Sequence, residues 1–453
     1  MTLTLTLTHK CPALLIAAPA SGQGKTTVTA GLARLMTLRG HKVRVFKCGP
    51  DFLDPHWLAL ASNSAVHNLD LWLNGEDDIR ARLYEAAAQS DLILIEGVMG
   101  LFDGDPSAAD LAQRLVISVL AVIDASAMAG TFGALVHGLR YYRPHMPWAG
   151  VMANCVASDS HLQMLRQSLL PDVLEAANDM EIGWLGALRR DAEFSLPERN
   201  LGLTLASELP DAMKRLDHLA KALSDTPIGK LEIQDWQRWA VDFEARPMKP
   251  VDALLKGVKL AIAQDAAFCF IYQANLDTLK ALGAEVVFFS PLSDQEVPPC
   301  DAVWLPGGYP ELHLEALMRA QNCRASLLDH VSRDKPVWAE CGGMMPLFDA
   351  ITLLDGSRSP MWGLMTGEVT MKARLSALGP HQWVTKWGEL RGHTFHFSLV
   401  ETPLVPVGHT QATRQFGKPE AVYSKGSLKG SYFHAWFASN PESTAHLFLS
   451  ESR

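Results

Sequence analysis

The sequence lacks any pair of cysteines spaced for a metal site or a regular disulfide framework. Its seven cysteines are scattered along 453 residues, and no two of them form a Cys-x-x-Cys pair. Zinc ribbons and small disulfide-stabilised domains depend on such spacing. The cysteine pattern therefore excludes these two classes and predicts mostly buried thiols in a reducing compartment, the cytoplasm.

Long apolar runs are also missing. No segment approaches the roughly 20 apolar residues that a membrane-spanning helix needs. The first ten residues, MTLTLTLTHK, lack the basic start, the long apolar centre and the small-residue cleavage site of a signal peptide. We therefore expect no membrane partner.

Positive charge is scarce as well. The chain has 40 Lys and Arg against 49 Asp and Glu, a formal net charge of −9, and no basic stripe interleaved with aromatic residues. Nucleic-acid-binding surfaces need such a concentration of cations. We expect small molecules rather than nucleic acid as partners, since an acidic protein can still bind a polyanion where cations gather locally.

The sequence contains two stretches in which short apolar runs alternate with helical patterns. At this length the chain is too long for one ordinary core. The runs predicted as strands are 13–19, 42–47, 91–97, 116–124 and 148–154 in the first half and 258–265, 285–291, 301–308 and 336–343 in the second. This alternation predicts parallel sheets covered on both faces, so the fold class is α/β with two domains in series.

A charged, helical pattern separates the two halves. It covers about 205–250 and ends in ARPMKPVD, where two prolines in a polar setting are typical of a linker. We expect an N-terminal domain over residues 1–245, a linker over 246–257 and a C-terminal domain over 258–453.

Residues 16–36, IAAPASGQGKTTVTAGLARLM, have the pattern of a phosphate-binding loop, with a glycine-rich turn between a predicted strand and an amphipathic helix. In such a loop backbone N–H groups and the helix N-terminus face phosphates, a lysine reaches the outer phosphates, and a hydroxyl binds Mg²⁺. Pro19 replaces the first glycine of the usual pattern, which only assists the tight turn. The candidate ATP contacts are Ser21, Gly22, Gly24, Lys25, Thr26 and Thr27.

Four carboxylates follow other predicted strands of the N-terminal half. Asp51 and Asp54 lie in KCGPDFLDPHW, and Glu96 and Asp103 lie in EGVMGLFDGD. Open α/β sheets bind ligands at the carboxyl ends of their strands. Carboxylates beside a phosphate loop would repel ATP unless a divalent cation lies between them, and Mg²⁺ prefers such oxygens. We also expect at least one of the four to cap a helix or a turn.

A second candidate centre surrounds Cys341, which stands between a predicted strand and a predicted helix in PVWAECGGMMPLF. The positive end of that helix is expected to lower the pKa of the thiol, so that the thiolate is the nucleophile. Gly342 and Gly308 offer backbone N–H groups to an oxyanion. His434, in GSYFHAWF, is the candidate base, although a lone buried Cys or His is more often only packed.

Two further histidines, His393 and His396 in GHTFHFS, suggest a metal site by their spacing. The alternation in HTFHFSLV, however, predicts a strand, in which positions three apart point to opposite faces. We therefore expect no metal here. Substrate contact by one of the two and plain packing are both left open.

The N-terminal motifs APASGQGKTT, KCGPDFLDP, NLDLW and EGVMGLFDG resemble the N-terminal domain of cobyrinic acid a,c-diamide synthases, which is similar to dethiobiotin synthetase. The resemblance implies that ATP phosphorylates a carboxylate. It also implies that Thr26, Asp51 and Glu96 bind Mg²⁺ and that Asp54 and Asp103 lie near the substrate carboxylate. The chain departs from the family in DPSAADLA and in RNLGL, which contains Asn200.

The C-terminal motifs GGYPELH, AECGGMM, RGHTFHFS and GSYFHAWF resemble triad-type glutamine amidotransferases, in the branch shared by cobyrinic and cobyric acid synthases. The resemblance covers nearly the whole C-terminal half and implies that Cys341 is the nucleophile and His434 its base. Trp436 stands where relatives often have a second histidine. The family lacks the downstream acidic partner of other triad amidotransferases, and Glu442 is too weakly placed to supply it.

Together the resemblances imply ATP- and glutamine-dependent amidation of the a and c carboxylates of cobyrinate or hydrogenobyrinate, in cobalamin biosynthesis. Three alternatives are left open: the same chemistry on another tetrapyrrole such as nickel-sirohydrochlorin, the sibling cobyric acid synthases, and a non-catalytic P-loop switch protein. The switch protein would lack a glutaminase domain. The sequence also leaves open whether the macrocycle carries cobalt, which carboxylate reacts first, and whether the chain forms a homodimer.

Overall fold

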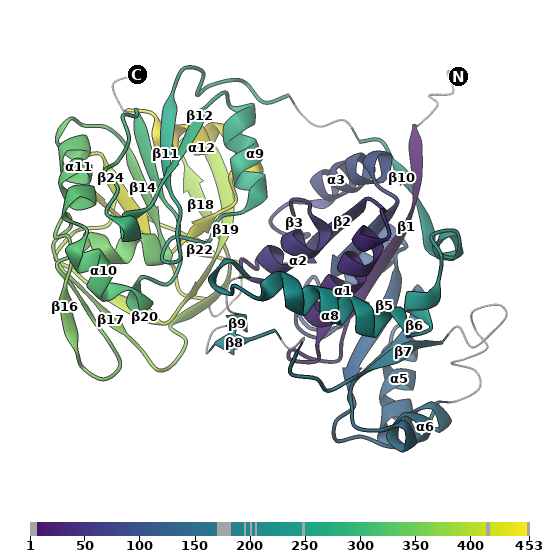
Figure 1. The fold of residues 1–453 in the computed structure, drawn as a ribbon. Coiled ribbons are helices and arrows are strands. Elements are labelled where there is room, and N and C mark those ends of the chain that lie inside the picture. The colour runs from purple at the N-terminus through teal and green to yellow at the C-terminus, as the bar shows by residue number, and fades with distance from the viewer. Residues whose placement is uncertain are drawn as a thin grey trace, which may run out of the picture. The chain divides into compact units, whose positions relative to one another are not determined.

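The computed structural model of the protein describes residues 7–169, 183–193, 196–199, 202–203, 206–246, 250–413 and 417–450. The chain divides into two compact units, Met1–Met248 and Lys249–Arg453, and each contains its own sheets and helices (Figure 1). Asn200 and positions 247–249 of the predicted linker lie outside the described residues.

The N-terminal unit alternates strands and helices along the chain. Its strands are β1 (Thr8–Ala17), β2 (Val43–Cys48), β3 (His67–Leu69), β4 (Leu92–Glu96), β5 (Ser118–Asp124), β6 (Trp148–Val156), β7 (Trp184–Arg189), β8 (Glu198–Arg199), β9 (Gly202–Leu203) and β10 (Ala240–Glu244). Its α-helices are α1 (Lys25–Leu38), α2 (Asp54–Ser62), α3 (Glu76–Gln89), α4 (Ala108–Leu115), α5 (Thr131–Tyr141), α6 (Asp159–Gln167) and α8 (Ala212–Ser224).

The main sheet of this unit has the strand order β3-β2-β4-β1-β5-β6-β7, and neighbouring strands along this path run parallel. Because the strands are parallel, their carboxyl ends lie at one edge of the sheet. The segments that follow β1, β2 and β4 contain the phosphate loop and the candidate carboxylates. The parallel sheet predicted for the N-terminal half is therefore confirmed.

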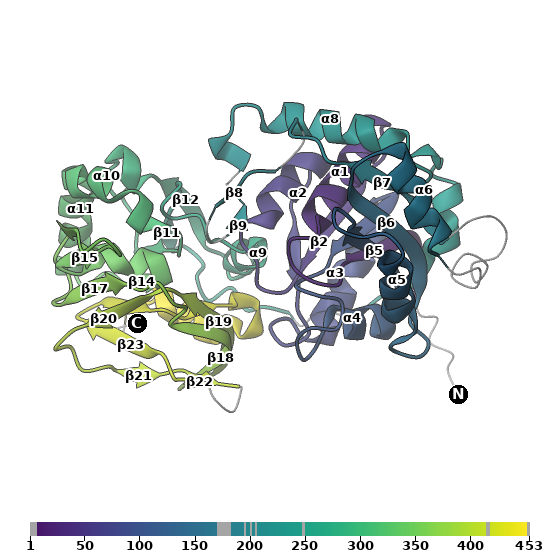
Figure 2. The ribbon, with the colours of Figure 1, turned by 90° about the horizontal axis from the view of Figure 1, so that it is seen from below.

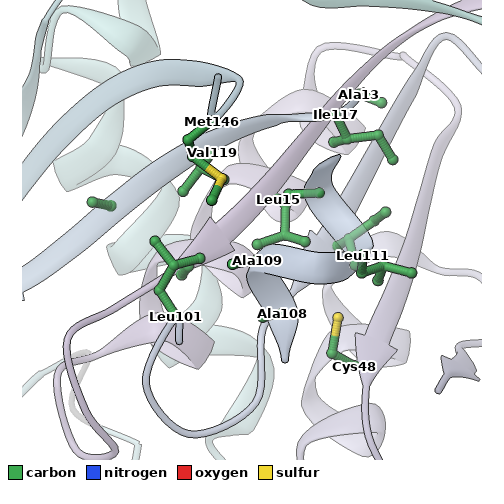
Figure 3. Packing of buried hydrophobic residues seen from close by; sticks show 14 of the residues in the cluster. Ala13, Leu15, Cys48, Leu101, Ala108, Ala109, Leu111, Ile117, Val119 and Met146 are labelled. Carbon is green, nitrogen blue, oxygen red and sulfur yellow. The ribbon is translucent and has the colours of Figure 1, made fainter. Parts of the chain in front are cut away.

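The central strand β1 is buried on both faces because its apolar side chains alternate between two helical layers. Leu14 and Ile16 pack in a core with residues of α1, α2 and α8. Leu15 and Ala17 pack in a second core with residues of α3, α4 and α5, part of which is shown in Figure 3. Figure 2 shows α8 and α1 on one side of the sheet and α3 and α4 on the other.

Two sequence-based expectations, the start of the first strand and the helical pattern over 205–250, need correction. The first strand begins at Thr8 rather than at residue 13, because its first half pairs antiparallel with β10. The helical pattern expected over 205–250 is wrong at Ala240–Glu244, which forms β10. The segment AVDFE alternates apolar and charged side chains, and pairing with β1 satisfies its backbone groups as a strand.

The C-terminal unit is also α/β but contains more antiparallel strands. Its strands are β11 (Lys259–Ala263), β12 (Glu285–Phe289), β13 (Ala302–Leu305), β14 (Val337–Glu340), β15 (Ala350–Thr352), β16 (Arg358–Pro360), β17 (Glu368–Met371), β18 (Ala377–Thr385), β19 (Gly388–His396), β20 (Ser398–Glu401), β21 (Gly408–His409), β22 (Gln411–Ala412), β23 (Ala421–Lys425), β24 (Leu428–Ser431) and β25 (His434–Ala435). Its helices are α9 (Gln273–Ala281), α10 (Leu314–Arg319), α11 (Gln321–Ser332), the 3-10 helix η6 (Cys341–Leu347) and α12 (Pro441–Phe448).

The largest sheet of this unit has the order β12-β11-β13-β14-β24-β23-β21, in which the first five strands are parallel. A four-stranded antiparallel sheet, β22-β18-β19-β25, adds a second layer that contains the predicted strand around His393 and His396. Across the described residues of both units, no helix combines the length and the apolar character needed to cross a bilayer.

We expect Leu15→Ala to lower the free energy of unfolding of the N-terminal unit by about 2–5 kcal/mol, because the side chain is fully buried in β1 and its removal leaves a cavity. In a unit of this size such a loss corresponds to a fall of about 5–15 °C in the thermal midpoint, measured by circular dichroism. The control is Leu38→Ala at the end of α1, where the side chain is 56% exposed and the midpoint should barely move. Equal midpoints for the two variants would contradict the assignment of Leu15 to the core.

Candidate functional site

The phosphate loop connects β1 to α1 and is held in shape by the neighbouring strand β6. Gly22 and Gly24 have φ angles of 75° and 93°, in the left-handed region that favours glycine. A Cβ on Gly24 would lie 2.1 Å from Nδ2 of Asn154, which donates to the carbonyl of Gln23 at 3.0 Å. The loop therefore requires glycine at position 24, and the sequence motif did not reveal the contribution of Asn154.

Lys25 is the first residue of α1, and its ammonium group lies over the loop. Nζ donates to the carbonyl oxygens of Ala20, at 3.0 Å, and Met99, at 2.7 Å. Burial lowers the pKa of Lys25 from its ordinary value. Ser21 is exposed in the loop, and Thr27 is half-buried in the first turn of α1.

Glu96, the last residue of β4, contacts the start of α1. Its Oε1 accepts a hydrogen bond of 2.7 Å from the hydroxyl of Thr26. Its side chain is fully buried, and burial raises the pKa of Glu96 to about 8. The second oxygen, Oε2, is buried and has no hydrogen-bond partner in the described parts of the chain.

Lys47, the penultimate residue of β2, lies among three of the predicted carboxylates. Its Nζ is 2.6 Å from Asp54 Oδ2, 2.9 Å from Glu96 Oε1 and 3.8 Å from Asp51 Oδ2. These acidic neighbours raise the pKa of Lys47 well above its ordinary value against the effect of burial. Sequence reasoning missed this residue, although its place at the buried end of a strand, within the quoted motif, was a usable signal.

Asp51 and Asp103 also shape the local backbone. Asp51 Oδ1 accepts hydrogen bonds from the backbone N–H groups of Leu53 and Asp54 at the start of α2, so the expected capping role is confirmed. Asp103 Oδ2 accepts from the Gly100 N–H at 2.9 Å. A Cβ on Gly100 would lie 2.5 Å from both that oxygen and the carbonyl of Pro19, so Asp103 lies beside the phosphate loop.

The donor set fits a magnesium ion that is shared with a nucleotide. In the parts of the chain that the structure describes, no group of three or more His, Cys, Asp or Glu side chains is arranged to hold a metal alone. Mg²⁺ usually takes one or two carboxylates and completes its shell with water and phosphate oxygens. The unpartnered Oε2 of Glu96, next to the Thr26 hydroxyl, suits such a ligand set.

In the C-terminal unit, Cys341 occupies a sharp turn between β14 and the 3-10 helix η6. Its φ angle is 45°, a strained value for a non-glycine residue. A Cβ on Gly342 would lie 2.4 Å from the carbonyl oxygen and 2.9 Å from the nitrogen of Gly308. The backbone of Gly308 therefore packs directly on the turn, and both predicted N–H donors belong to these two contacting segments.

The expectation that a helix end lowers the pKa of Cys341 is wrong. The side chain is buried, and loss of water raises the pKa of the thiol far above its ordinary value. The N–H of Gly342 acts in the predicted, lowering direction, but its effect is smaller than that of burial. The free enzyme therefore holds a neutral thiol.

The strand β19 brings His434 and Cys341 to the same region. His434 is the Cα partner of His393 in the pairing of β25 with β19, and the Cys341 thiol donates to the carbonyl of Phe395 at 3.8 Å. A Cβ on Gly307 would lie 2.5 Å from Cε1 of His434. The backbone at Gly307 and Gly308 therefore contacts both the imidazole of His434 and the turn that contains Cys341. Burial lowers the pKa of His434 to about 3.

Sequence reasoning also missed the acidic neighbour of His434. Oε2 of Glu340, the residue before Cys341, lies 3.8 Å from Nδ1 of His434, and both side chains are buried. The place of Glu340 at the end of a buried strand was the available signal. At the position two residues after His434, the indole of Trp436 packs edge-on against Tyr272.

His393 and His396 are both buried, with different neighbours. The ring of His393 stacks on that of His434 at a centroid distance of 4.9 Å. His396 lies 3.0 Å from Glu420 through Nε2 and stacks on Tyr432. The predicted separation of the two side chains is confirmed.

Comparison with known proteins matches a different family to each of the two units. Residues 14–203 match the model of the CobQ/CobB/MinD/ParA nucleotide binding domain, and residues 259–442 match that of the CobB/CobQ-like glutamine amidotransferase domain. The chain is 52% identical over 439 residues to hydrogenobyrinate a,c-diamide synthase of Stutzerimonas stutzeri, covering 97% of this chain and 99% of that protein. The chain belongs to the family of hydrogenobyrinate and cobyrinate a,c-diamide synthases.

Two further relatives have similar coverage. The Pseudomonas aeruginosa protein of the same name is 48% identical over 97% of each chain. The cobyrinate a,c-diamide synthase of Herminiimonas arsenicoxydans is 44% identical over 98% of each chain. The family and the fold class predicted from the sequence are confirmed, and the amidotransferase domain removes the non-catalytic switch protein from the alternatives.

We expect Lys47→Met to destabilise the N-terminal unit by about 3–5 kcal/mol, because three carboxylates within 4 Å of Nζ would lose their buried counter-charge. The measurement is the thermal midpoint, with Lys42→Met as the control because Lys42 is exposed at the start of the same strand region. A Lys47→Met midpoint equal to that of the control would show that the carboxylates do not need the ammonium group.

Proposed function

We propose that this chain catalyses the ATP- and glutamine-dependent amidation of the a and c carboxylates of hydrogenobyrinate or cobyrinate, in cobalamin biosynthesis. The observation that carries the proposal is the presence in one chain of a phosphate loop with buried carboxylates and of a buried cysteine and a buried histidine that both lie against β19. The names of the relatives supply the substrate.

In the N-terminal unit the loop residues would hold ATP. Backbone N–H groups at Ser21, Gly22 and Gly24 would face the phosphates, Lys25 would neutralise their outer charge, and Thr27 would contact them from the first turn of α1. Thr26 and Glu96, with Asp51 nearby, would hold Mg²⁺. When bound, the ion supplies positive charge to the outer phosphates.

The remaining charged groups would receive the macrocycle carboxylate. An oxygen of that carboxylate attacks the terminal phosphorus and ADP leaves, which gives an acyl phosphate. Asp54 and Asp103 lie at the edge where this carboxylate must approach, and Lys47 offsets the repulsion among the acidic side chains.

In the C-terminal unit Cys341 would attack the side-chain carbonyl of glutamine. The thiol proton passes to His434, and the N–H groups of Gly308 and Gly342 face the oxyanion. His434 then donates the proton to the leaving nitrogen, ammonia departs, and water hydrolyses the thioester to glutamate. Ammonia attacks the acyl phosphate, so that phosphate leaves and a carboxamide forms.

The direct test is product analysis by mass spectrometry after incubation with ATP, Mg²⁺, glutamine and each candidate macrocycle. We expect two successive amidations of hydrogenobyrinate, cobyrinate or both, each dependent on ATP. Nickel-sirohydrochlorin is the comparison substrate. Failure to amidate either corrinoid, with the protein folded, would overturn the proposal.

We expect Lys25→Ala and Thr26→Ala to abolish amidation with either glutamine or ammonia, while glutaminase chemistry at Cys341 remains possible. The reason is that both side chains belong to the proposed nucleotide site and not to the site around Cys341. The control is Thr37→Ala, since its hydroxyl donates to the Ala33 carbonyl on the same helix, away from the phosphate loop. Full amidation by Lys25→Ala would remove the phosphate loop from the mechanism.

Cys341→Ser should lose glutamine-dependent amidation and keep amidation with concentrated ammonium salts, because ammonia attacks the acyl phosphate without help from the thiol. Cys323→Ser, a buried cysteine of α11, is the control and should use both nitrogen sources. The measurement is product mass with the two nitrogen sources in parallel. Normal activity of Cys341→Ser on glutamine would contradict the role given to this residue.

A further inference from the structure

Glu340 is directed toward His434 by two hydrogen bonds to its carboxylate. The indole Nε1 of Trp338 donates to Glu340 Oε1 at 2.7 Å, and the backbone N–H of Ala435 also donates to this side chain. Trp338 and Glu340 are two residues apart on β14, so their side chains lie on the same face of the strand. With Oε1 held by the indole, Oε2 lies 3.8 Å from Nδ1 of His434.

An ionised Glu340 in the protein interior would lower the stability of the folded unit. The side chain of Glu340 is almost completely buried, and burial raises its pKa to about 8. A buried carboxylate is destabilising unless a positive charge and hydrogen bonds compensate it. In the free enzyme the imidazole beside it is neutral, because burial holds the pKa of His434 low. The compensating charge appears only when His434 takes up a proton.

We propose that Glu340 is the acidic positioning residue of the glutaminase centre, acting through Nδ1 of His434. This inference rests on the proposed function, because it assigns His434 the proton transfer at Cys341. A carboxylate on the Nδ1 side keeps the proton of the neutral ring on Nδ1 and leaves Nε2 free of a proton as the acceptor. Distances of this kind are commonly long before substrate binds and shorten in the reacting complex.

Glu340 acts at the step in which His434 holds the proton of the Cys341 thiol. When Sγ of Cys341 bonds to the glutamine carbonyl carbon, the thiol proton moves to Nε2 and His434 becomes an imidazolium. The imidazolium favours the ionised form of Glu340, and the two opposite charges stabilise each other at short range in a buried site. The proton then leaves with the ammonia, and the imidazole returns to its neutral form.

The residues downstream of His434 also favour Glu340, at the end of β14, as its acidic partner. Downstream of the histidine, Trp436 packs its indole against Tyr272. Glu442 lies farther on, in the first turn of α12. Glu340, by contrast, precedes the nucleophile directly, so one strand end presents both the thiol and the carboxylate.

The first test is the steady-state glutaminase activity of Glu340→Gln. Glutamine retains an oxygen for the Trp338 indole and removes only the charge. We expect kcat to fall about 100-fold, as for loss of assisted proton transfer, with the KM for glutamine within about twofold of wild type. Ammonia-dependent amidation should be unchanged. Glu340→Asp should recover part of kcat, and the control Glu442→Gln should match wild type.

The second test follows the reactivity of Cys341 toward iodoacetamide as the pH is varied. Removing the carboxylate destabilises the thiolate–imidazolium pair, so the pH at which alkylation reaches half its maximal rate should rise by about one unit in Glu340→Gln. A residue with a purely structural role would leave this profile in place. An unshifted profile, or glutaminase kcat within twofold of wild type, would overturn the inference.

The variants separate this inference from the function on which it rests. If Cys341→Ser loses glutamine-dependent activity and Glu340→Gln keeps it, the assignment of Glu340 fails while the amidotransferase stands. If Cys341→Ser retains glutaminase activity, the proposed function itself fails. A Glu340→Gln variant that also loses ammonia-dependent amidation would contradict a role confined to His434.

Discussion

The N-terminal site depends on the ion pairs between the buried ammonium group of Lys47 and three carboxylates. Asp51 and Asp54 come from the segment after β2 and Glu96 from the end of β4, at the carboxyl edge of one parallel sheet, and each would repel the others without a cation among them. Lys47 provides that cation from within the protein. The arrangement keeps the carboxylates close together before any ligand binds, and it leaves Oε2 of Glu96 available next to the phosphate loop.

The C-terminal site follows the opposite principle, since burial keeps its reacting groups neutral. The pKa of Cys341 is raised and that of His434 is lowered, both by loss of water. The thiolate form of Cys341 is therefore high in free energy in the free enzyme. The neutral thiol is less reactive toward other electrophiles. In the mechanism that we propose, the charged pair forms only when the proton moves from Cys341 to His434, and the nearby backbone N–H groups and Glu340 then stabilise charge.

Backbone geometry links these electrostatic arrangements to the fold. Gly24 and Gly342 stand where a Cβ would collide with Asn154 and with the backbone of Gly308. Gly24 is the last residue of the loop between β1 and α1, and Gly342 lies in the first turn of η6, directly after β14. The two centres therefore share a local arrangement, in which a glycine between a strand and a helix allows another segment to approach closely.

The sequence by itself determined the features that depend on neighbours along the chain. Apolar runs predicted the strands on either side of Lys25 and Cys341, and glycine spacing predicted the phosphate loop. The tertiary structure decided whatever depends on contacts between distant segments. The pairing of β10 with β1, the approach of Lys47 to Glu96 and that of Glu340 to His434 have no local signature. The pKa values of Cys341 and His434 likewise follow from burial, which is a property of the packed unit and not of the residues beside them in the sequence.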